Sequence, residues 1–272
     1  MKILLGTELA GYIKERQAKQ VRTLRQAELV IPKLVIIQTT DNPVIASYVK
    51  MKVLYGEDIL VDVDVRTPAE ADLFSEIEKT NKDASVHGMI IQLPLANKEQ
   101  TDTAVNLVDP KKDVDGLGKM ATLTPATPMA IDWLLAGYNV DLSDKKIKII
   151  GNGRLVGEPL SKLWRSAGYD VEVFDEHTEN MLEKLTKGEV IVSAAGVPGL
   201  IPPSALQHGA VVVDAATASE HGKIVGDVSE EARQRDDLTI TPLKGGVGPL
   251  TVCALFDNVI RAARAAAEQA KG

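Results

Sequence analysis

The sequence contains a single cysteine, Cys253, so no disulfide can form within the chain. This absence fits a reducing compartment. Because the chain has only 4 histidines and none in a recognisable pairing with the cysteine, a place in the core or on a helix face is favoured for Cys253 over a nucleophilic role. Aromatic residues make up only 4% of the chain. A core built from Val, Ile, Leu and Ala is typical of layered α/β proteins.

Long apolar runs and an excess of basic residues are also missing. No segment approaches the roughly 20 apolar residues that a membrane span needs, and the apolar stretch at the N-terminus is too short for a signal peptide. We therefore expect a cytoplasmic protein without a membrane partner. The net charge of -7 argues against nucleic acid as a partner. The 272 residues, 44% of them hydrophobic, are enough for one large domain or two of ordinary size.

Strand and helix patterns alternate along the chain. A surface helix is expected over residues 7–27, and Gly56 is expected to end the helix that carries Tyr48. Further helices are expected at 68–80, 99–107, 127–137, 158–167 and 250–269. Strands are expected at 34–38, 59–65, 87–94, 146–150, 171–174, 190–196 and 210–214. This order predicts mostly parallel sheets covered by helices, with ligands beyond the carboxyl ends of the strands.

Five polar side chains stand out in the first half. Tyr48 and Lys52 are neighbours on one helix face, so a flat ligand on the Tyr48 ring would present its edge to the amine, an arrangement suited to acid/base work on a conjugated heterocycle. An ordinary amphipathic surface is the simpler alternative. Gln92 lies near the end of a strand, and Asp113 and Asp115 occupy a loop that also reads as a solvated turn. No further acidic residues follow at calcium-loop spacing, so no metal is expected.

Two glycine-rich segments mark the second half. The segment 151–157 follows a strand and opens a helix, so Gly151 permits a tight turn and Gly153 lets the backbone approach a pyrophosphate. Asp175 and Glu176 follow the next strand, where an acid that bonds the adenosine ribose is expected. A turn that merely needs glycine is the alternative. In the segment 241–251 the backbone can pass close to a ligand, although a flexible linker has the same composition.

Several separated motifs coincide with those of one family. With these motifs the chain resembles the bifunctional methylenetetrahydrofolate dehydrogenase/methenyltetrahydrofolate cyclohydrolase family over nearly its whole length. The matching segments are Tyr48 to Lys52, Gln92 to Leu95, Lys112 to Gly116, Thr127-Pro128, Val156 to Pro159, Gly226 to Val228 and Gly245 to Thr251.

The resemblance implies an N-terminal folate domain over 1–126, a Rossmann-like dinucleotide-binding domain over 127–249, a helix 250–272 that packs back on the first domain, and an active-site cleft between the two. It also implies a homodimer. Lys52 would be the acid/base group, Tyr48 would stack on the folate, Gln92 would hold Lys52, and Asp115 would bond the pterin. Further implied folate contacts are Ile91, Leu93, Gly245, Gly246, Val247 and Gly248. Implied cofactor contacts are Gly151, Asn152, Gly153, Asp175, Glu176 and Thr217.

The chain departs from the family at several positions. Gly151-Asn152-Gly153 replaces the usual Gly-Arg-Ser, and Asp175-Glu176 replaces the usual His-Ser. Because two carboxylates repel a 2′-phosphate and accept from ribose hydroxyls, we expect NAD rather than the NADP typical of bacterial members. Lys244 replaces a proline, and either meets a folate carboxylate or points to solvent.

Two other functions stay open from the sequence alone. One is a cyclohydrolase with a degenerate cofactor site, suggested by Asn152 and Asp175. The other is a non-catalytic, regulatory dinucleotide-binding protein.

Overall fold

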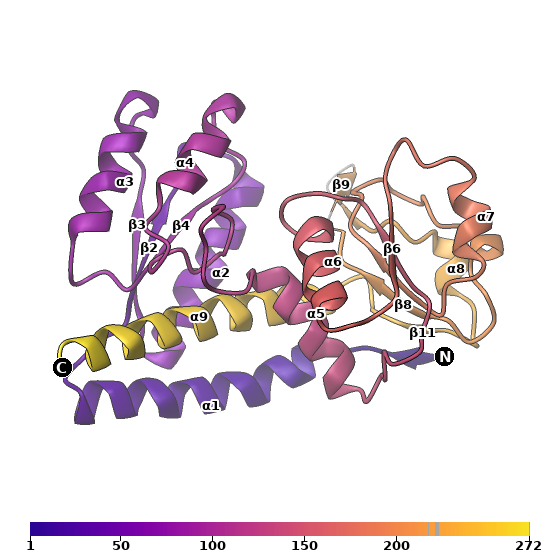
Figure 1. Ribbon diagram of the computed structural model, residues 1–272, viewed down its shortest axis with the longest axis horizontal. Coiled ribbons are helices and arrows are strands. Elements are labelled where there is room, and N and C mark those ends of the chain that lie inside the picture. Colours follow the sequence, from indigo (N-terminus) through magenta and orange to yellow (C-terminus); the bar gives the residue numbers. More distant parts are fainter. Residues whose placement is uncertain (217, 221–222, 272) are drawn as a thin grey trace. The chain divides into compact units, whose positions relative to one another are not determined.

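A computed structural model describes residues 1–216, 218–220 and 223–271 (Figure 1). The chain forms two compact units. We call Met1–Ala10 with Thr127–Thr251 the six-stranded unit, and Gly11–Ala126 with Val252–Gly272 the three-stranded unit. The division differs from the expected domain 1–126 at its first ten residues, which join the six-stranded unit. Within the described ranges, no helix is long and apolar enough to cross a membrane.

The three-stranded unit is built around a parallel sheet in the order β3-β2-β4. Its strands are β2 (Lys33–Ile37), β3 (Asp62–Arg66) and β4 (Gly88–Ile91). Its helical segments are α1 (Gly6–Ala27), α2 (Pro43–Ile59), η1 (Glu70–Asp72), α3 (Leu73–Lys82), η2 (Lys98–Gln100), α4 (Thr101–Leu107) and α9 (Val247–Gln269), of which α1 and α9 begin in the six-stranded unit.

The central strand β2 is buried on both faces, as the expected layered architecture requires. Val35 and Ile37 pack in one cluster with residues of α3, α4 and β4. Because side chains alternate along a strand, Leu34 and Ile36 point to the opposite face, where they are also fully buried. Such continuous apolar strands are typical of parallel sheets with helices on both sides.

Helix α2 begins and ends through identifiable backbone features. The Asn42 side chain accepts a hydrogen bond from the backbone N–H of Val44 at 2.8 Å, and Pro43 fits the first turn. Leu60, in the left-handed region with φ 67°, caps the other end. The expectation that Gly56 ends the helix is therefore wrong. Gly56 lies inside the helix, at a position where a Cβ would collide with the Val63 side chain, so glycine is needed there for close packing of α2 on β3.

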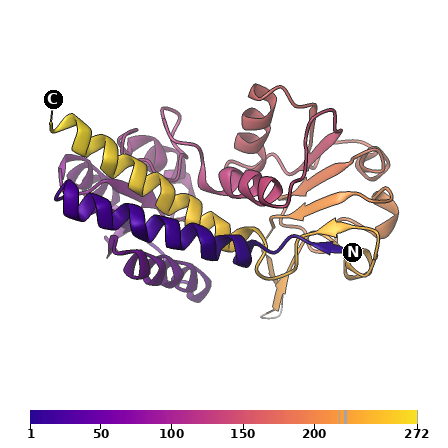
Figure 2. The ribbon, with the colours of Figure 1, turned by 90° about the horizontal axis from the view of Figure 1, so that it is seen from below.

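The two longest helices of the chain lie side by side in the three-stranded unit, from Gly11 of α1 and Val252 of α9 onward (Figures 1 and 2). The fully buried Gln17 amide on α1 donates to the carbonyl oxygen of Cys253 on α9 at 2.8 Å. The Tyr55 hydroxyl of α2 lies 2.7 Å from Gln17 Oε1 and 3.2 Å from Cys253 Sγ. Cys253 is fully buried, which confirms its expected place in the core.

The six-stranded unit has a parallel sheet in the order β1-β11-β8-β7-β5-β6. Its strands are β1 (Lys2–Ile3), β5 (Ile147–Ile150), β6 (Val171–Phe174), β7 (Val190–Ser193), β8 (Val211–Asp214) and β11 (Thr239–Ile240). The helical segments are α5 (Ala126–Gly137), α6 (Gly157–Ser166), α7 (Met181–Leu185), η3 (Pro203–Ala205) and α8 (Glu230–Arg233), and β9 (Ala218–Glu220) pairs antiparallel with β10 (Lys223–Val225).

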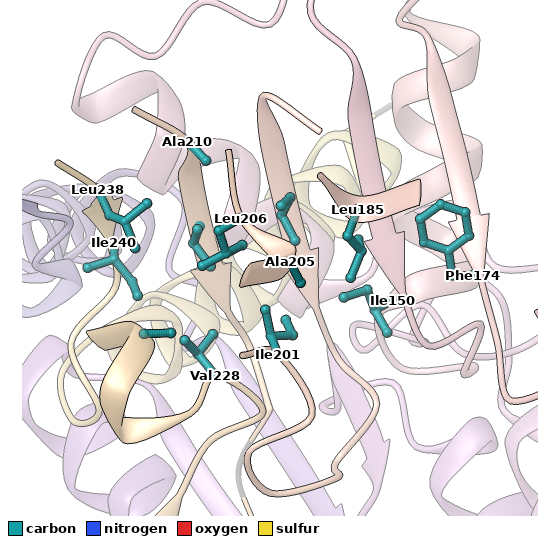
Figure 3. Packing of buried hydrophobic residues seen from close by; sticks show 13 residues of the cluster. Ile150, Phe174, Leu185, Ile201, Ala205, Leu206, Ala210, Val228, Leu238 and Ile240 are labelled. Atoms are coloured by element: carbon teal, nitrogen blue, oxygen red, sulfur yellow. The ribbon is translucent and has the colours of Figure 1, made fainter. Parts of the chain in front are cut away.

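One face of the six-stranded sheet carries a single apolar cluster (Figure 3). Ile150 and Phe174 come from neighbouring strands, and Leu185 of α7 covers them. Ile201, Val228 and Ile240 continue the cluster toward the β11 side of the sheet. This packing fixes the ends of β5 and β6, which the glycine-rich segment 151–157 and the residues Asp175 and Glu176 follow.

We predict that Phe174→Ala destabilises the six-stranded unit by about 3–5 kcal/mol, because the ring is 1% exposed in this cluster. Leu182→Ala, on the exposed side of α7, should change stability by no more than about 0.5 kcal/mol. Both tryptophans, Trp133 and Trp164, belong to this unit, so their fluorescence during urea unfolding reports on it. Equal effects of the two substitutions would contradict this packing.

Candidate functional site

The structure brings Lys52 and Gln92 together. Gln92 extends the β4 ladder, since its backbone N–H donates to the Ile37 carbonyl at 2.8 Å. Ile91 packs toward α3 and α4, so alternation directs the Gln92 side chain to the other face, on which α2 lies. There Lys52 Nζ donates to Gln92 Oε1 at 2.7 Å. Because Gln92 Nε2 donates to the Leu93 carbonyl at 3.0 Å, the amide presents its oxygen to the amine.

Burial changes the proton affinity of Lys52 and of Asp115 in opposite directions. Burial lowers the pKa of Lys52, and the negative charge of Asp115 partly opposes that shift. Burial likewise raises the pKa of Asp115, and the positive charge of Lys52 opposes it. A lysine with a lowered pKa can accept and return a proton closer to neutral pH than an ordinary lysine can.

The loop that carries Asp115 is held from within by Asp113. The Asp113 carboxylate is buried, and it accepts backbone hydrogen bonds from Gly116 at 2.9 Å and from Gly118 at 2.8 Å. The loop also joins β4, because Met89 N–H donates to the Lys112 carbonyl at 2.7 Å. The interpretation as a solvated turn is therefore wrong. The two carboxylates differ in role: Asp113 shapes the loop, and Asp115 interacts with Lys52.

Tyr48 lies one helical turn before Lys52 on α2 and is 37% exposed. Val44 and Met51, at 49% and 46% exposed, flank it along the same side of the helix. An exposed apolar stripe of this kind gives a flat ring a surface to stack on, next to the amine.

The glycine turn of the six-stranded unit has the geometry of a phosphate site. Gly151 has φ +90°, and a Cβ there would lie 2.6 Å from the Ala194 carbonyl oxygen. A Cβ on Gly157 would collide with the Gly151 carbonyl, so glycine permits the close packing of α6 on the turn. Gly153, in contrast, faces open space. Val156 gives α6 no side-chain cap, but the Glu158 N–H donates to the Gly153 carbonyl at 3.1 Å and Pro159 has no N–H.

Asp175 and Glu176 follow β6, directly beside the glycine turn that follows β5. Ile150 pairs with Phe174, so the two segments leave adjacent strand ends. The Asp175 carboxylate accepts from the backbone N–H of His177 and from the Thr178 hydroxyl, both at 3.0 Å. These hydrogen bonds lower the pKa of Asp175, so the exposed group carries a negative charge. Asn152 is exposed as well, and Thr217 lies outside the described residues.

The segment 241–248 is not a flexible linker. The Gly245 carbonyl, at a residue with φ +82°, accepts from the Thr7 backbone N–H at 3.1 Å. A Cβ on Gly6 would collide with the Gly246 carbonyl, so the two chain segments touch. Val247 and Gly248 already belong to α9. Lys244 is exposed within this fixed segment.

Sequence reasoning missed two polar residues. Asp227 is fully buried and accepts from the Ser193 hydroxyl at 2.6 Å and the Val197 N–H at 2.7 Å, which fixes the loop after β7. Gln38 ends β2 beside Gln92, and its Oε1 is buried without a hydrogen-bond partner among the described residues. Gln38 and Gln92 each follow an apolar strand directly, and this shared position in the sequence is the signal that could have identified Gln38. In the described part of the chain, no three His, Cys, Asp or Glu side chains gather to hold a metal ion.

Two family models match the chain. Residues 4–115 match the model described as the tetrahydrofolate dehydrogenase/cyclohydrolase catalytic domain. Residues 125–267 match the model described as the tetrahydrofolate dehydrogenase/cyclohydrolase NAD(P)-binding domain. Together the models cover both candidate sites.

Known proteins agree with these models over nearly the full length. The chain is 35% identical to the bifunctional protein FolD of Hydrogenobaculum sp., over 96% of this chain and 98% of that protein. The crystal structure of bifunctional FolD from Campylobacter jejuni is similar at TM-score 0.92 and 31% identity, covering 97% and 99% of the two chains. The Trypanosoma brucei enzyme, complexed with NADP and an inhibitor, is similar at TM-score 0.90 and 25% identity, covering 97% of each chain.

We predict that the Lys52 amine titrates below about 10.4, the ordinary value for lysine, because burial disfavours its charge. Competitive labelling with an amine reagent, followed by mass spectrometry of the Lys52 peptide across pH, measures the midpoint. In Asp115→Asn the midpoint should fall further, since the opposing negative charge is gone. A midpoint at the ordinary value, or a rise in Asp115→Asn, would contradict the geometry.

Proposed function

The chain belongs to the tetrahydrofolate dehydrogenase/cyclohydrolase family, and we propose that it catalyses both reactions of that name. The enzyme oxidises 5,10-methylenetetrahydrofolate to 5,10-methenyltetrahydrofolate with a nicotinamide dinucleotide, and then hydrolyses the product to 10-formyltetrahydrofolate. The observation that carries this proposal is the half-buried Lys52 amine, held by Gln92 Oε1 at 2.7 Å on the segment that matches the catalytic-domain model.

The hydrolysis gives Lys52 a defined task. Water adds to the methenyl carbon and loses a proton, and the neutral amine accepts that proton. When the bond from this carbon to N5 breaks, the ammonium gives its proton to N5 and the hydroxyl of the adduct loses its proton to solvent as the formyl carbonyl forms, so the lysine ends as it began. The lowered pKa of Lys52 makes the neutral amine easier to form than in an ordinary lysine. Gln92 supports the cycle, since its oxygen accepts from the amine in either state.

The oxidation needs orientation more than proton transfer. Hydride leaves the methylene carbon, and positive charge develops on the folate ring system, so the carbon must be held at a fixed angle and away from water. Tyr48 supplies the stacking surface, and Asp115 accepts from the pterin N–H groups. Ile91 and Leu93, on either side of Gln92, pack their side chains into the cluster that α3 and α4 cover, so only their backbone is proposed to border the ring. Gly245, Gly246, Val247, Gly248 and Lys244 are proposed as further folate contacts.

The residues of the glycine turn fit a dinucleotide. Gly151, Asn152 and Gly153 would hold its diphosphate near the start of α6, and the open space beside Gly153 supports the assignment. When bound, the nicotinamide accepts the hydride. We propose that NAD is preferred, because the charged Asp175 and its neighbour Glu176 stand at the adjacent strand end and would repel a 2′-phosphate.

Two further proposals follow from family membership: the enzyme acts as a homodimer, and it is cytoplasmic. Of the three functions left open by the sequence, the comparisons support the bifunctional enzyme. They support neither a cyclohydrolase with a degenerate cofactor site nor a non-catalytic regulatory protein.

We predict that Lys52→Met lowers the rate of methenyltetrahydrofolate hydrolysis by about 10²–10⁴, because it removes the group that moves both protons. Met keeps the length and apolar stem of lysine, so the urea midpoint of the variant should stay close to that of the parent protein. Lys50→Met, on the exposed side of the same helix, serves as the matched control and should keep its activity. Full hydrolysis by Lys52→Met would refute the assignment.

We predict a higher kcat/KM for the dehydrogenase with NAD than with NADP. The variant Asp175→Asn/Glu176→Gln should shift the NAD:NADP ratio toward NADP by roughly tenfold or more, equivalent to about 1.4 kcal/mol. Glu179→Gln removes an exposed carboxylate a few residues away and should leave the ratio unchanged. A parent enzyme that prefers NADP, or a double variant with an unaltered ratio, would refute the proposed selectivity.

A further inference from the structure

One buried amide on α9 ties together both ends of the loop that carries Asp115. Asn258 is fully buried. Its Nδ2 donates to the Val114 carbonyl at 2.9 Å and to the Thr124 carbonyl at 2.8 Å. A primary amide nitrogen has two hydrogens, so these two bonds use its whole donor capacity. All three residues belong to the three-stranded unit.

Other hydrogen bonds hold separate parts of the loop between these two points. It reverses direction at Gly116, which has φ +70°, and Asp113 fastens its first half from inside. Asn258 connects that first half to the returning segment at Thr124 from a different element, the helix α9. Asp115 directly follows Val114, so a shift of the Val114 carbonyl also moves Asp115.

We propose that Asn258 is a positioning residue, which holds Asp115 at its distance from Lys52 by pinning Val114 and Thr124. The proposal rests on the proposed function, in which both side chains serve catalysis. It adds a contribution of the C-terminal helix to acid/base chemistry that takes place on α2 and β4.

The physical link between Asn258 and the amine is electrostatic. Lys52 is faced by the neutral Gln92 amide from β4 and by the Asp115 carboxylate from the loop, and Asp113 acts on Asp115 as a second negative charge. Attraction between Asp115 and Lys52 decreases as their separation grows. Loosening the loop should therefore lower the proton affinity of Lys52, in the same direction as removal of the Asp115 charge.

The test is a double-mutant cycle read by the Lys52 labelling titration, which needs no turnover. Asn258→Leu keeps the branching at Cγ and removes both donors, and Asn258→Ser keeps one shorter donor in case the larger leucine folds poorly. Each is combined with Asp115→Asn. The control is Gln17→Leu, which removes another fully buried amide that donates to a backbone carbonyl, away from the loop.

In the parent background, Asn258→Leu should shift the Lys52 midpoint down by roughly half a pH unit, and Asn258→Ser by less. In the Asp115→Asn background, neither substitution should shift it further. Gln17→Leu should lower the urea midpoint and leave the titration unchanged. We also expect Asn258→Leu to lower kcat/KM for hydrolysis on the order of tenfold to 100-fold, as for a misplaced group.

Two outcomes would overturn the proposal. One is an unmoved or raised Lys52 midpoint in both Asn258 variants, which would leave Asn258 with a purely structural role. The other is a downward shift that persists in the Asp115→Asn background, which would show that Asn258 acts by another route. Failure of the proposed function appears elsewhere, as hydrolysis that survives Lys52→Met, so the two failures are distinguishable.

Discussion

The structure of the proposed folate site depends on one hydrogen bond, from Lys52 Nζ to Gln92 Oε1. The bond requires a helix and a strand end to meet at a fixed distance. The strand end is fixed because β4 lies beside the fully buried β2, and the helix is fixed because Gly56 lets α2 approach β3 closely. Neither requirement concerns catalysis directly. Both requirements set the position of the half-buried Lys52 amine, and burial at that position lowers its pKa.

The loop that carries Asp113 and Asp115 is also shaped by contacts outside the proposed chemistry. Asp113 and Asp115 are two residues apart and chemically identical, yet the backbone N–H groups around Asp113 engage it fully, while Asp115 is left to interact with Lys52. In the six-stranded unit, Asp227 organises the loop after β7 in the same way. The buried carboxylates of Asp113 and Asp227 thus fix the backbone of the loops around them through hydrogen bonds.

Much of this could be predicted from the sequence, and the reasons for the failures are physical. The long apolar strands are recognisable because periodicity is a local property, whereas Lys52, Gln92 and Asp115 were assigned roles through the resemblance of their motifs to those of the family. The strands β1 and β11 have only two residues each, too few for any pattern, and they form because distant segments pair. Gly56 resembled a helix end because its packing partner, Val63, follows only after the chain reverses. The partners of Asp113 were likewise invisible, since one-dimensional spacing does not show which carboxylate faces inward.

The most direct test of the account compares two pH titrations of the same enzyme. One follows the Lys52 side-chain nitrogen by NMR in protein labelled with ¹⁵N-lysine, with Lys52→Met to assign the signal. The other follows kcat/KM for hydrolysis of methenyltetrahydrofolate. If the Lys52 amine moves the protons, the kinetic profile will bend at the pKa measured for that amine, below the ordinary lysine value. A kinetic profile that bends elsewhere, while the amine titrates normally, would contradict it.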